Sequence, residues 1–437
     1  MKDLIERCGN TEGIDHSGEA DGSSSKGNDT VPIRMLSDEG SDIEGIIENL
    51  DRNMGLASTL DGKNYQVGIS VKQLSSLIRF MGVVNHTDDL PYEIKVHANG
   101  VVEIRECEMA SYMDLLPAFG RLLFEDLALS PDLALFHRIY HEHEIKRCQT
   151  LFGMKVADQD CVGICNDFVM VLRAEGQRIG IKRLIRNWQR NADENAKRLT
   201  IYMDALHDRY ARLMVIRLEL MYRQTACRDL EQATAWGEKL KESHFRAYAA
   251  MESGELPDDD GDDLPRVDIF TMTNDWRHFK DNMRGKPSLF RHMVGYVASI
   301  EFSSTGGHHM HVALIFDGSQ VKQHEWLGDQ IGQYWVEVTG GRGYFHNCNR
   351  GSYKYPGTGL INHHDEMKRQ NLMRTLMYLA KKDQFVRVKA SPKSKTFMTG
   401  HLPEPPTGRT GRPRVKGAPG AADEAHPRDD GSMAEAA

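Results

Sequence analysis

Apolar and polar residues alternate along two segments of the chain, as they do in half-buried β-strands. Residues 92–106 read YEIKVHANGVVEIRE, and the Asn99-Gly100 pair at their centre suits the positive φ angles of a two-residue turn. Residues 212–223, RLMVIRLELMYR, form a second β-rich run. The pattern therefore predicts a β-hairpin at 92–106 and a strand at 212–223.

Apolar residues at spacings of three and four predict amphipathic helices in other segments. This spacing occurs at 109–150, at 181–209, in DLEQATAWGEKLKESHFRAYAAM after the predicted strand, and at 365–382, DEMKRQNLMRTLMYLAKK. The middle of the chain is therefore expected to be mostly helical. Strands and helices together predict an α+β fold, in which an antiparallel sheet has helices packed on one face.

The segment YVASIEFSSTGGHHMHVALIFDG, residues 296–318, contains two β-rich runs around SSTGG, whose glycines suit a turn. It is predicted to be an antiparallel hairpin whose even positions form a continuous apolar face. The odd positions include Glu301, His309 and His311, and folding about residue 305 or 306 sets Glu301 opposite one of the histidines. Because carboxylates and imidazoles are common metal ligands, this face is predicted to bind a metal ion.

The histidine triplet is weak as an isolated signal, because the chain contains 19 histidines. A second triplet, His141-Glu142-His143, falls in a segment predicted to be helical, where residues two apart do not share a face. We interpret that second triplet as ordinary helix surface.

Tyr378 and Lys381 lie three residues apart in the predicted helix 365–382, so they share a face. A phenol with a pKa of roughly 10 is a poor nucleophile, but a nearby cation or metal favours its ionised form. Tyr378 is therefore the candidate nucleophile and Lys381 its electrostatic partner. A buried tyrosine that serves only the core is the alternative. Tyr353 and Tyr355, in the glycine-bounded loop segment SYKYPG, are the most plausible substitutes.

The net charge of −8 hides an uneven distribution. Residues 1–50 carry four Lys/Arg and twelve Asp/Glu, so the rest of the chain is neutral, and residues 381–416 hold ten Lys/Arg against two Asp/Glu. Such a segment can follow a phosphate backbone, although a solvated tail without a partner is the alternative. The candidate nucleic-acid contacts in it are Lys382, Arg387, Lys389, Arg412 and Arg414.

Composition divides the chain into four parts. Residues 1–50, rich in Gly, Ser and acidic residues, and residues 401–437, rich in Pro, Gly and Ala, are expected to be disordered. Residues 51–180 are expected to form the hairpin and a mostly helical region of unknown role. Residues 181–400 carry the residues of the predicted site. An acidic insertion at 252–263 interrupts this part and is expected to lie at the surface in contact with solvent.

The seven cysteines are widely scattered, which favours free thiols in a reducing compartment. No apolar run reaches the roughly 18 residues that a membrane helix needs. The N-terminus has acidic residues where a signal peptide has a basic start and an apolar stretch. A cytoplasmic location without membrane contact is therefore expected.

The order of Glu301, the His309–His311 pair and a YxxK motif about 70 residues later is similar to that of the HUH endonucleases, which start rolling-circle replication. More narrowly, VIRLELMY at 215–222, YWVEVTGGRGYFHNCNR at 334–350 and YLAKKDQF at 378–385 resemble replication proteins of filamentous phages, the inoviruses, and their prophage relatives. With residues 289–318, these segments resemble the YagK/YfjJ C-terminal domain family over about 190 residues. Glu219 stands where an aspartate is expected.

This resemblance implies an HUH-type (Rep-type) nuclease domain in which Glu301, His309 and His311 hold Mg²⁺ or Mn²⁺, Tyr378 is the nucleophile and Lys381 stabilises charge. It also implies nicking of single-stranded or origin DNA through a 5′-phosphotyrosine, with host replication proteins as further partners. Ligand type does not exclude zinc. Two other functions are open: a non-catalytic DNA-binding regulator of a prophage, and a hydrolase that uses metal-bound water and does not need Tyr378.

Overall fold

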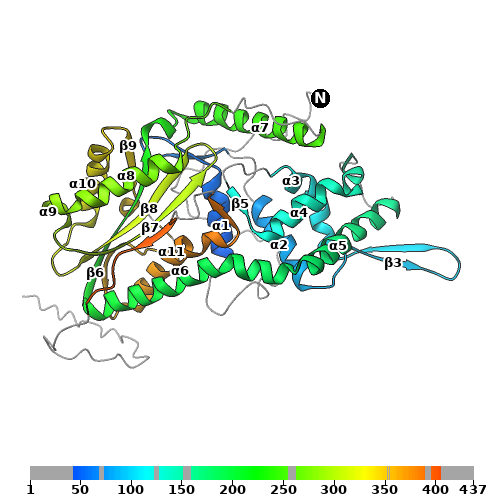
Figure 1. Cartoon of the computed structure of the whole chain (residues 1–437), viewed down its shortest axis with the longest axis horizontal. Coiled ribbons are helices and arrows are strands. Elements are labelled where there is room, and N and C mark those ends of the chain that lie inside the picture. The colour runs from blue at the N-terminus through cyan, green and yellow to red at the C-terminus, as the bar shows by residue number, and fades with distance from the viewer. Residues whose placement is uncertain are drawn as a thin grey trace, which may run out of the picture.

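A computed structural model describes residues 43–67, 73–122, 127–150, 159–253, 262–351, 353, 355–388 and 395–404 (Figure 1). The described strands form one six-stranded sheet and three two-stranded sheets, and all pairings within them are antiparallel. Helices account for much of the remainder. The predicted α+β class with antiparallel sheets is confirmed.

The central sheet has the strand order β10-β6-β8-β7-β12, and β9 pairs with the other half of the β6 edge. Its longest strands are the two arms of the predicted hairpin and the predicted strand that begins at Arg212. The strands are β6 (Arg212–Tyr222), β7 (Met293–Ser303), β8 (Gly307–Asp317), β9 (Gly343–Asn347), β10 (Gly359–Asn362) and β12 (Phe397–Thr399).

One face of this sheet is apolar along its whole length. The even positions of the hairpin, such as Met310 and Leu314, pack against Trp276 and Trp335 from the helices above them. Phe279, on the same helix as Trp276, stacks on it at a ring-centroid distance of 5.5 Å and lies 5.9 Å from the Trp335 ring. The covering helices are α8 (Ile269–Asn282), α9 (Pro287–Phe290) and α10 (His324–Val338). The apolar face expected from residue alternation is thus confirmed.

The opposite face of the sheet is apolar at one end and polar at the other. At one end Val215, Val297 and Ile315 pack with Leu206 and Leu376 of the covering helices in a large core. At the other end the strands carry the charged and imidazole side chains described below. The covering helices are α1 (Ile43–Met54), α6 (Ile181–Arg209) and α11 (Glu366–Lys381). Helices therefore cover both faces of the sheet, whereas the sequence predicted helices on one face. They cover the second face because part of it is apolar as well.

The region before α6 shares this large core. Leu127 and Leu129 of β5 pair with Val388 and Val386 of β11, so a strand from this region binds the chain just after α11. The predicted hairpin around Gly100 is confirmed and projects from the body in Figure 1. The elements of the region are β1 (Leu56–Ser58), β2 (Asn64–Gln66), α2 (Gln73–His86), β3 (Tyr92–Val96), β4 (Val102–Glu106), η2 (Glu108–Leu115), α3 (Leu116–Gly120), β5 (Leu127–Leu129), α4 (Pro131–Glu142), η3 (Glu144–Thr150) and α5 (Gln159–Ile179).

Short 3-10 turns, one further helix and the strand β11 complete the described elements. They are α7 (Leu230–Ser253), which confirms the helix predicted after β6, and η4 (Arg223–Thr225), η5 (Met283–Gly285), η6 (Cys348–Arg350), η7 (Lys382–Gln384) and β11 (Val386–Val388). None of the helices in the described part of the chain has the length and apolar character needed to cross a membrane.

Residues 43–50 correct the expectation that the first 50 residues lack structure. They form most of α1, and Ile46, Ile47 and Leu50 are buried. The three apolar residues lie on one face of the helix. The overall composition of residues 1–50 is polar, so composition alone did not predict this helix. Most of the acidic insertion lies outside the described residues, but Asp262 at its end is buried and pairs with Arg266.

Candidate metal and tyrosine site

Two paired strands, β7 and β8, bring the predicted metal ligands together at the polar end of the sheet face, and the neighbouring β6 adds Glu219. Glu301 of β7 pairs with His309 of β8, and Ser299 pairs with His311. The hairpin therefore turns about residue 305, as predicted. On the other side of β8, Glu219 of β6 pairs with His311. Because paired residues point to the same face, four ligand-type side chains share this end.

The nearest atoms of the three predicted ligands are close enough to bind one ion. His309 Nε2 and His311 Nε2 lie 3.1 Å apart, and His311 Nε2 lies 3.3 Å from Glu301 Oε2. One ligand atom from each of the three residues lies within 4.8 Å of the others. Two ligands about 2.1 Å from one ion, at angles of about 90–110°, are roughly 3.0–3.4 Å apart. The spacing of these side chains fits a single metal ion.

Glu301 also contains an unsatisfied oxygen. The residue is 4% exposed, and its Oε1 has no hydrogen-bond partner among the described residues. A buried carboxylate oxygen normally has a partner, because removing it from water is costly. A cation held between this carboxylate and the two imidazoles would supply that partner. The donor set therefore fits a divalent metal ion.

The charges in this cluster shift its pKa values in opposite directions. Burial raises the pKa of Glu301, but the positive charges of His311 and Lys382 outweigh burial and the net shift is downward. Burial and the neighbouring His311 lower the pKa of His309 to about 4. Burial lowers the pKa of His311, but the charges of Glu301 and Glu219 outweigh burial, and the net shift is upward. His309 is thus a neutral imidazole at neutral pH, which is the metal-binding form.

Glu219 is positioned to orient one of the histidines. Its Oε1 lies 3.6 Å from His311 Nδ1 and accepts a hydrogen bond from Cys348 Sγ at 3.8 Å. Histidines that bind metals commonly present their second ring nitrogen to a carboxylate, which sets the direction of the first. The sequence alone assigned no role to Glu219, which stands where an aspartate is expected; its position beside His311 depends on the register between β6 and β8.

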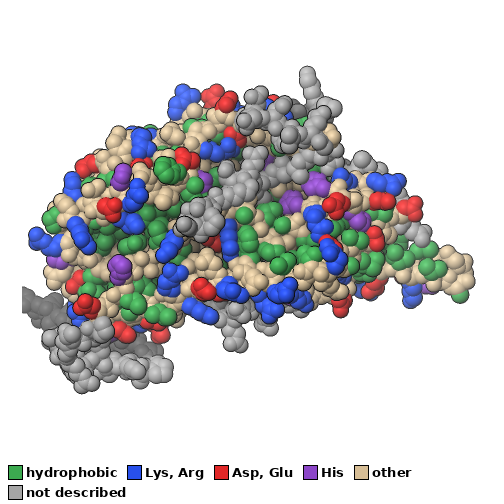
Figure 2. Space-filling view, in the orientation of Figure 1, with side chains coloured by type: hydrophobic (Ala, Val, Ile, Leu, Met, Phe, Trp, Pro, Cys, Tyr) green, Lys and Arg blue, Asp and Glu red, His purple; other side chains and the backbone are tan. Residues whose placement is uncertain are grey.

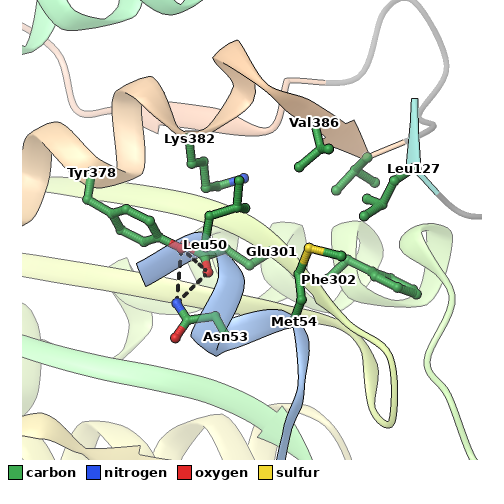
Figure 3. A pocket seen from close by; sticks show the side chains of 10 residues that line it. Leu50, Asn53, Met54, Leu127, Glu301, Phe302, Tyr378, Lys382 and Val386 are labelled. Atoms are coloured by element: carbon green, nitrogen blue, oxygen red, sulfur yellow. Dashed lines mark hydrogen bonds between the residues drawn. The ribbon is translucent and has the colours of Figure 1, made fainter. Parts of the chain in front are cut away.

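Tyr378 of α11 points toward Glu301 of this cluster (Figure 3). Its hydroxyl donates a hydrogen bond to Glu301 Oε2 at 3.1 Å. Asn53 of α1 donates from Nδ2 to the Tyr378 hydroxyl at 3.0 Å and to Glu301 Oε2 at 3.2 Å. Burial and the carboxylate of Glu301 raise the pKa of Tyr378 well above its usual value. The structure thus brings the predicted nucleophile to the predicted metal ligands.

Asn53 was missed by the sequence analysis, because nothing local distinguishes it from other polar residues on a helix. It belongs to α1, which packs against α11 and β7 through Leu50 and its apolar neighbours. The hollow beside Tyr378 draws its lining from segments far apart in the chain (Figure 3). That lining consists of Leu50, Asn53, Met54, Leu127, Glu301, Phe302, Tyr378, Lys382, Val386 and Val388.

The two lysines after Tyr378 both form ion pairs within the protein, and Lys382 is the more buried of the two. Lys381 Nζ lies 3.9 Å from Asp193 on α6, and no hydrogen bond among the described residues joins it to Tyr378. Lys382, expected on a basic surface, is 5% exposed. Its Nζ donates to the Ile300 carbonyl at 2.9 Å and to Asp383 Oδ1 at 3.0 Å. The helix ends at Lys381, and the following 3-10 turn directs Lys382 inward.

Arg387 is also not a free surface cation. Its guanidinium lies 4.0 Å from the centroid of the Trp188 ring, and its Nε donates to the Asp383 carbonyl at 3.0 Å. A half-buried arginine held in this way ties β11 to α6. The remaining predicted nucleic-acid contacts, Lys389, Arg412 and Arg414, lie outside the described residues.

An exposed basic surface occurs instead on the first half of α6. Lys182, Arg183, Arg186 and Arg190 are exposed, and no acidic residue occurs between 181 and 192. Three of these residues recur every fourth position, so they form one row along the helix. Figure 2 shows Lys and Arg side chains along the edge that α6 forms. We call these four residues the α6 basic row. The spacing was visible in the sequence, but their exposure was not.

Comparison with known proteins places part of this chain in a family. No curated protein sequence and no solved structure matches it. A family model described as the YagK/YfjJ C-terminal domain matches residues 177–397, about half of the chain. The matched span contains Glu301, His309, His311 and Tyr378, but not Asn53. The chain therefore belongs to the YagK/YfjJ C-terminal domain family.

Proposed function

We propose that this protein is a metal-dependent endonuclease that nicks single-stranded DNA and forms a 5′-phosphotyrosine at Tyr378. The observation that supports this most directly is the 3.1 Å hydrogen bond between the Tyr378 hydroxyl and Glu301 Oε2, because Glu301 is one of the three residues of the candidate metal cluster. The resemblance to HUH endonucleases adds the expectation that nicking starts rolling-circle replication of a phage or mobile element. The HUH type of the fold is part of the same proposal.

Glu301, His309 and His311 are the residues proposed to hold the metal ion, with Glu219 orienting His311. When bound, a divalent cation supplies charge neutralisation and Lewis acidity at the scissile phosphate. Two imidazoles and one carboxylate suit Mn²⁺ and Zn²⁺ as well as Mg²⁺, so the choice of metal rests on the resemblance, which favours Mg²⁺ or Mn²⁺.

Tyr378 attacks the phosphorus of the scissile phosphodiester in line with the departing 3′ oxygen. The bond from Tyr378 Oη to phosphorus forms while the bond from phosphorus to the 3′ oxygen breaks. The phenolic proton is released, and the 3′ oxygen takes up one from water, so the proton count is unchanged. The products are a 5′-phosphotyrosine and a free 3′-hydroxyl that a polymerase can extend, and the covalent bond allows later rejoining.

The neighbouring side chains hold the nucleophile in place. Asn53 and Glu301 both form hydrogen bonds with the Tyr378 hydroxyl, which restricts rotation of the phenol. We assign the electrostatic role expected for Lys381 to Lys382, since its charge acts on Glu301 while Lys381 faces Asp193. The α6 basic row is proposed to contact the phosphate backbone away from the reaction centre.

The test is to incubate the protein with a labelled single-stranded oligonucleotide and Mn²⁺ and to look for a covalent protein–DNA adduct on a denaturing gel. Wild type is expected to form the adduct, and Tyr378→Phe is expected to form none while keeping its fold and metal binding. The phenylalanine variant loses at most a hydrogen bond of about 1 kcal/mol, so its stability is expected to change little.

Three other outcomes would contradict the proposal. DNA binding without cleavage by wild type would favour a regulator. Cleavage by Tyr378→Phe without an adduct would favour metal-bound water as the attacking group. An adduct mapped by peptide analysis to another tyrosine, Tyr353 or Tyr355 above all, would refute the assignment of the nucleophile.

A further inference from the structure

The loop between η6 and β10 exposes two aromatic rings next to the candidate site. Tyr353 is 40% exposed and Tyr355 is 39% exposed. An exposed large aromatic side chain loses the free energy that its burial would provide, so a pair of them on one short loop calls for an explanation. We do not assign the role of nucleophile to these two tyrosines, because the hydroxyl that forms a hydrogen bond with Glu301 is that of Tyr378.

Each ring lies against an arginine from an element that also carries a site residue. Arg217 Cζ lies 5.9 Å from the centroid of the Tyr353 ring, and Arg217 is two residues before Glu219 on β6. Arg374 Cζ lies 4.1 Å from the centroid of the Tyr355 ring. Arg374 is one helical turn before Tyr378 on α11, so the two side chains lie on the same face of that helix.

The loop packs on itself at one end and against α11 at the other. A Cβ at Gly351 would lie 2.8 Å from a Tyr353 ring carbon, so the ring packs on the loop backbone itself. A Cβ at Gly357 would lie 2.8 Å from the Leu372 Cα, which leaves room only for glycine where the loop crosses α11. Burial raises the pKa of Tyr353, and the nearby Cys348 and Glu219 raise it further.

We propose that Tyr353 and Tyr355 are stacking platforms for the bases of single-stranded DNA beside the scissile phosphate, with Arg217 and Arg374 contacting the adjoining phosphates. Aromatic rings stack with any base, and guanidinium groups next to them neutralise the backbone, which is how sequence-tolerant single-strand binding works. A duplex keeps its base faces stacked internally and offers them no such contact. The inference rests on the proposed nicking function and adds the path of its substrate.

The experiment measures binding apart from cleavage. Every protein carries Tyr378→Phe, and fluorescence anisotropy follows binding of a labelled oligonucleotide and of an abasic one of equal length and charge. The double variant Tyr353→Ala, Tyr355→Ala is expected to bind the normal oligonucleotide at least about tenfold more weakly, because each stacked base contributes about 1–3 kcal/mol. Its affinity for the abasic oligonucleotide is expected to stay close to that of the parent.

Two controls separate stacking from damage to the fold. Tyr353→Phe with Tyr355→Phe keeps both rings and is expected to bind like the parent protein. Phe270→Ala removes a ring that is 79% exposed on α8, on the opposite face of the sheet, and is also expected to bind like the parent. Thermal melting of each variant checks the fold.

Unchanged binding by the alanine double variant, or an equal loss on both oligonucleotides, overturns the stacking proposal but leaves the adduct test of Tyr378 untouched. Binding of duplex DNA as tight as that of single strands also overturns it. In a further outcome, the wild type forms no adduct while the alanine double variant loses affinity for the normal oligonucleotide alone. That result refutes the nicking function and supports single-strand binding by the two rings.

Discussion

The side-chain amide of Asn53 lies 3.0 Å from the hydroxyl of Tyr378, although 325 residues separate them along the chain. Asn53 lies outside residues 177–397, the span that matches the family. The tyrosine and the metal ligands lie within it. The site of this protein is therefore a composite, in which α1 of the N-terminal region covers a cluster that the family domain builds.

Replacing Asn53 with alanine is expected to slow adduct formation about fivefold, because it removes the hydrogen bond that orients the Tyr378 hydroxyl, which contributes about 1 kcal/mol. The measurement is the single-turnover rate of adduct formation. Asn49→Ala is the matched control: Asn49 lies one turn earlier on α1 and, among the residues that the structure describes, donates only to the Gly45 carbonyl. A rate for Asn53→Ala at or above that of Asn49→Ala would show that the amide does not position the nucleophile.

Mn²⁺ is expected to raise the melting temperature of the DNA-free protein, because it binds the folded cluster and not the unfolded chain. At a hundredfold excess over the dissociation constant the stabilisation is about 2.7 kcal/mol. The double variant His309→Ala, His311→Ala is expected to show no Mn²⁺-dependent shift. Replacing the neighbouring pair His363 and His364 is expected to preserve the shift. Equal shifts in both double variants would refute the site.

Lys382→Met is expected to destabilise the protein far more than Lys381→Met. The first change leaves the buried Asp383 carboxylate without its ion-pair partner, and such a loss costs about 3–5 kcal/mol. The second removes a 3.9 Å pair with a half-exposed Asp193, for which at most about 1 kcal/mol is expected. Urea unfolding of the two variants compares them, and similar losses of stability would mean that the burial of Lys382 is unimportant.

Replacing Arg183, Arg186 and Arg190 with glutamine is expected to weaken single-stranded DNA binding and to flatten its salt dependence. Three lost phosphate contacts lower the slope of log affinity against log salt by about 2, since each contact on a single strand contributes about 0.7. Binding is measured at several salt concentrations. The same replacement of Arg277, Arg284 and Arg291, which are exposed beyond the opposite sheet face, should leave the slope unchanged.

A triple variant in the α6 basic row that keeps the wild-type slope would show that this row is only a solvated helix face. A loss of affinity without a change of slope would point to an indirect effect on the fold.

Stability is expected to fall below about pH 6.5 through His137. Burial lowers its folded-state pKa to about 4, with a smaller contribution from the neighbouring His141. The unfolded state therefore takes up a proton before the folded state does, and stability that is complete above pH 6.5 is lost as the pH falls toward 4. His137→Leu should reduce this slope in urea unfolding between those pH values. An unchanged slope would contradict the role of His137.

The sequence determined the parts of the site that depend on neighbouring residues. The alternation at 296–318 and the turn within SSTGG already place Glu301 opposite one of the two histidines, which the structure identifies as His309, because a strand has a period of two and a tight turn limits the register. The spacing at 365–382 likewise predicts the helix of Tyr378. Such patterns are local, so no knowledge of distant segments is needed to interpret them.

Only the tertiary structure decided which distant groups meet. Asn53 reaches Tyr378 because the apolar face of α1 packs on α11, and Glu219 reaches His311 through the β6–β8 register. The direction of Lys382 depends on where α11 ends, and the 3-10 turn after it buries an ammonium that composition had placed at the surface. These contacts result from packing between segments far apart in the chain, and the local periodicity of neither segment specifies its partner.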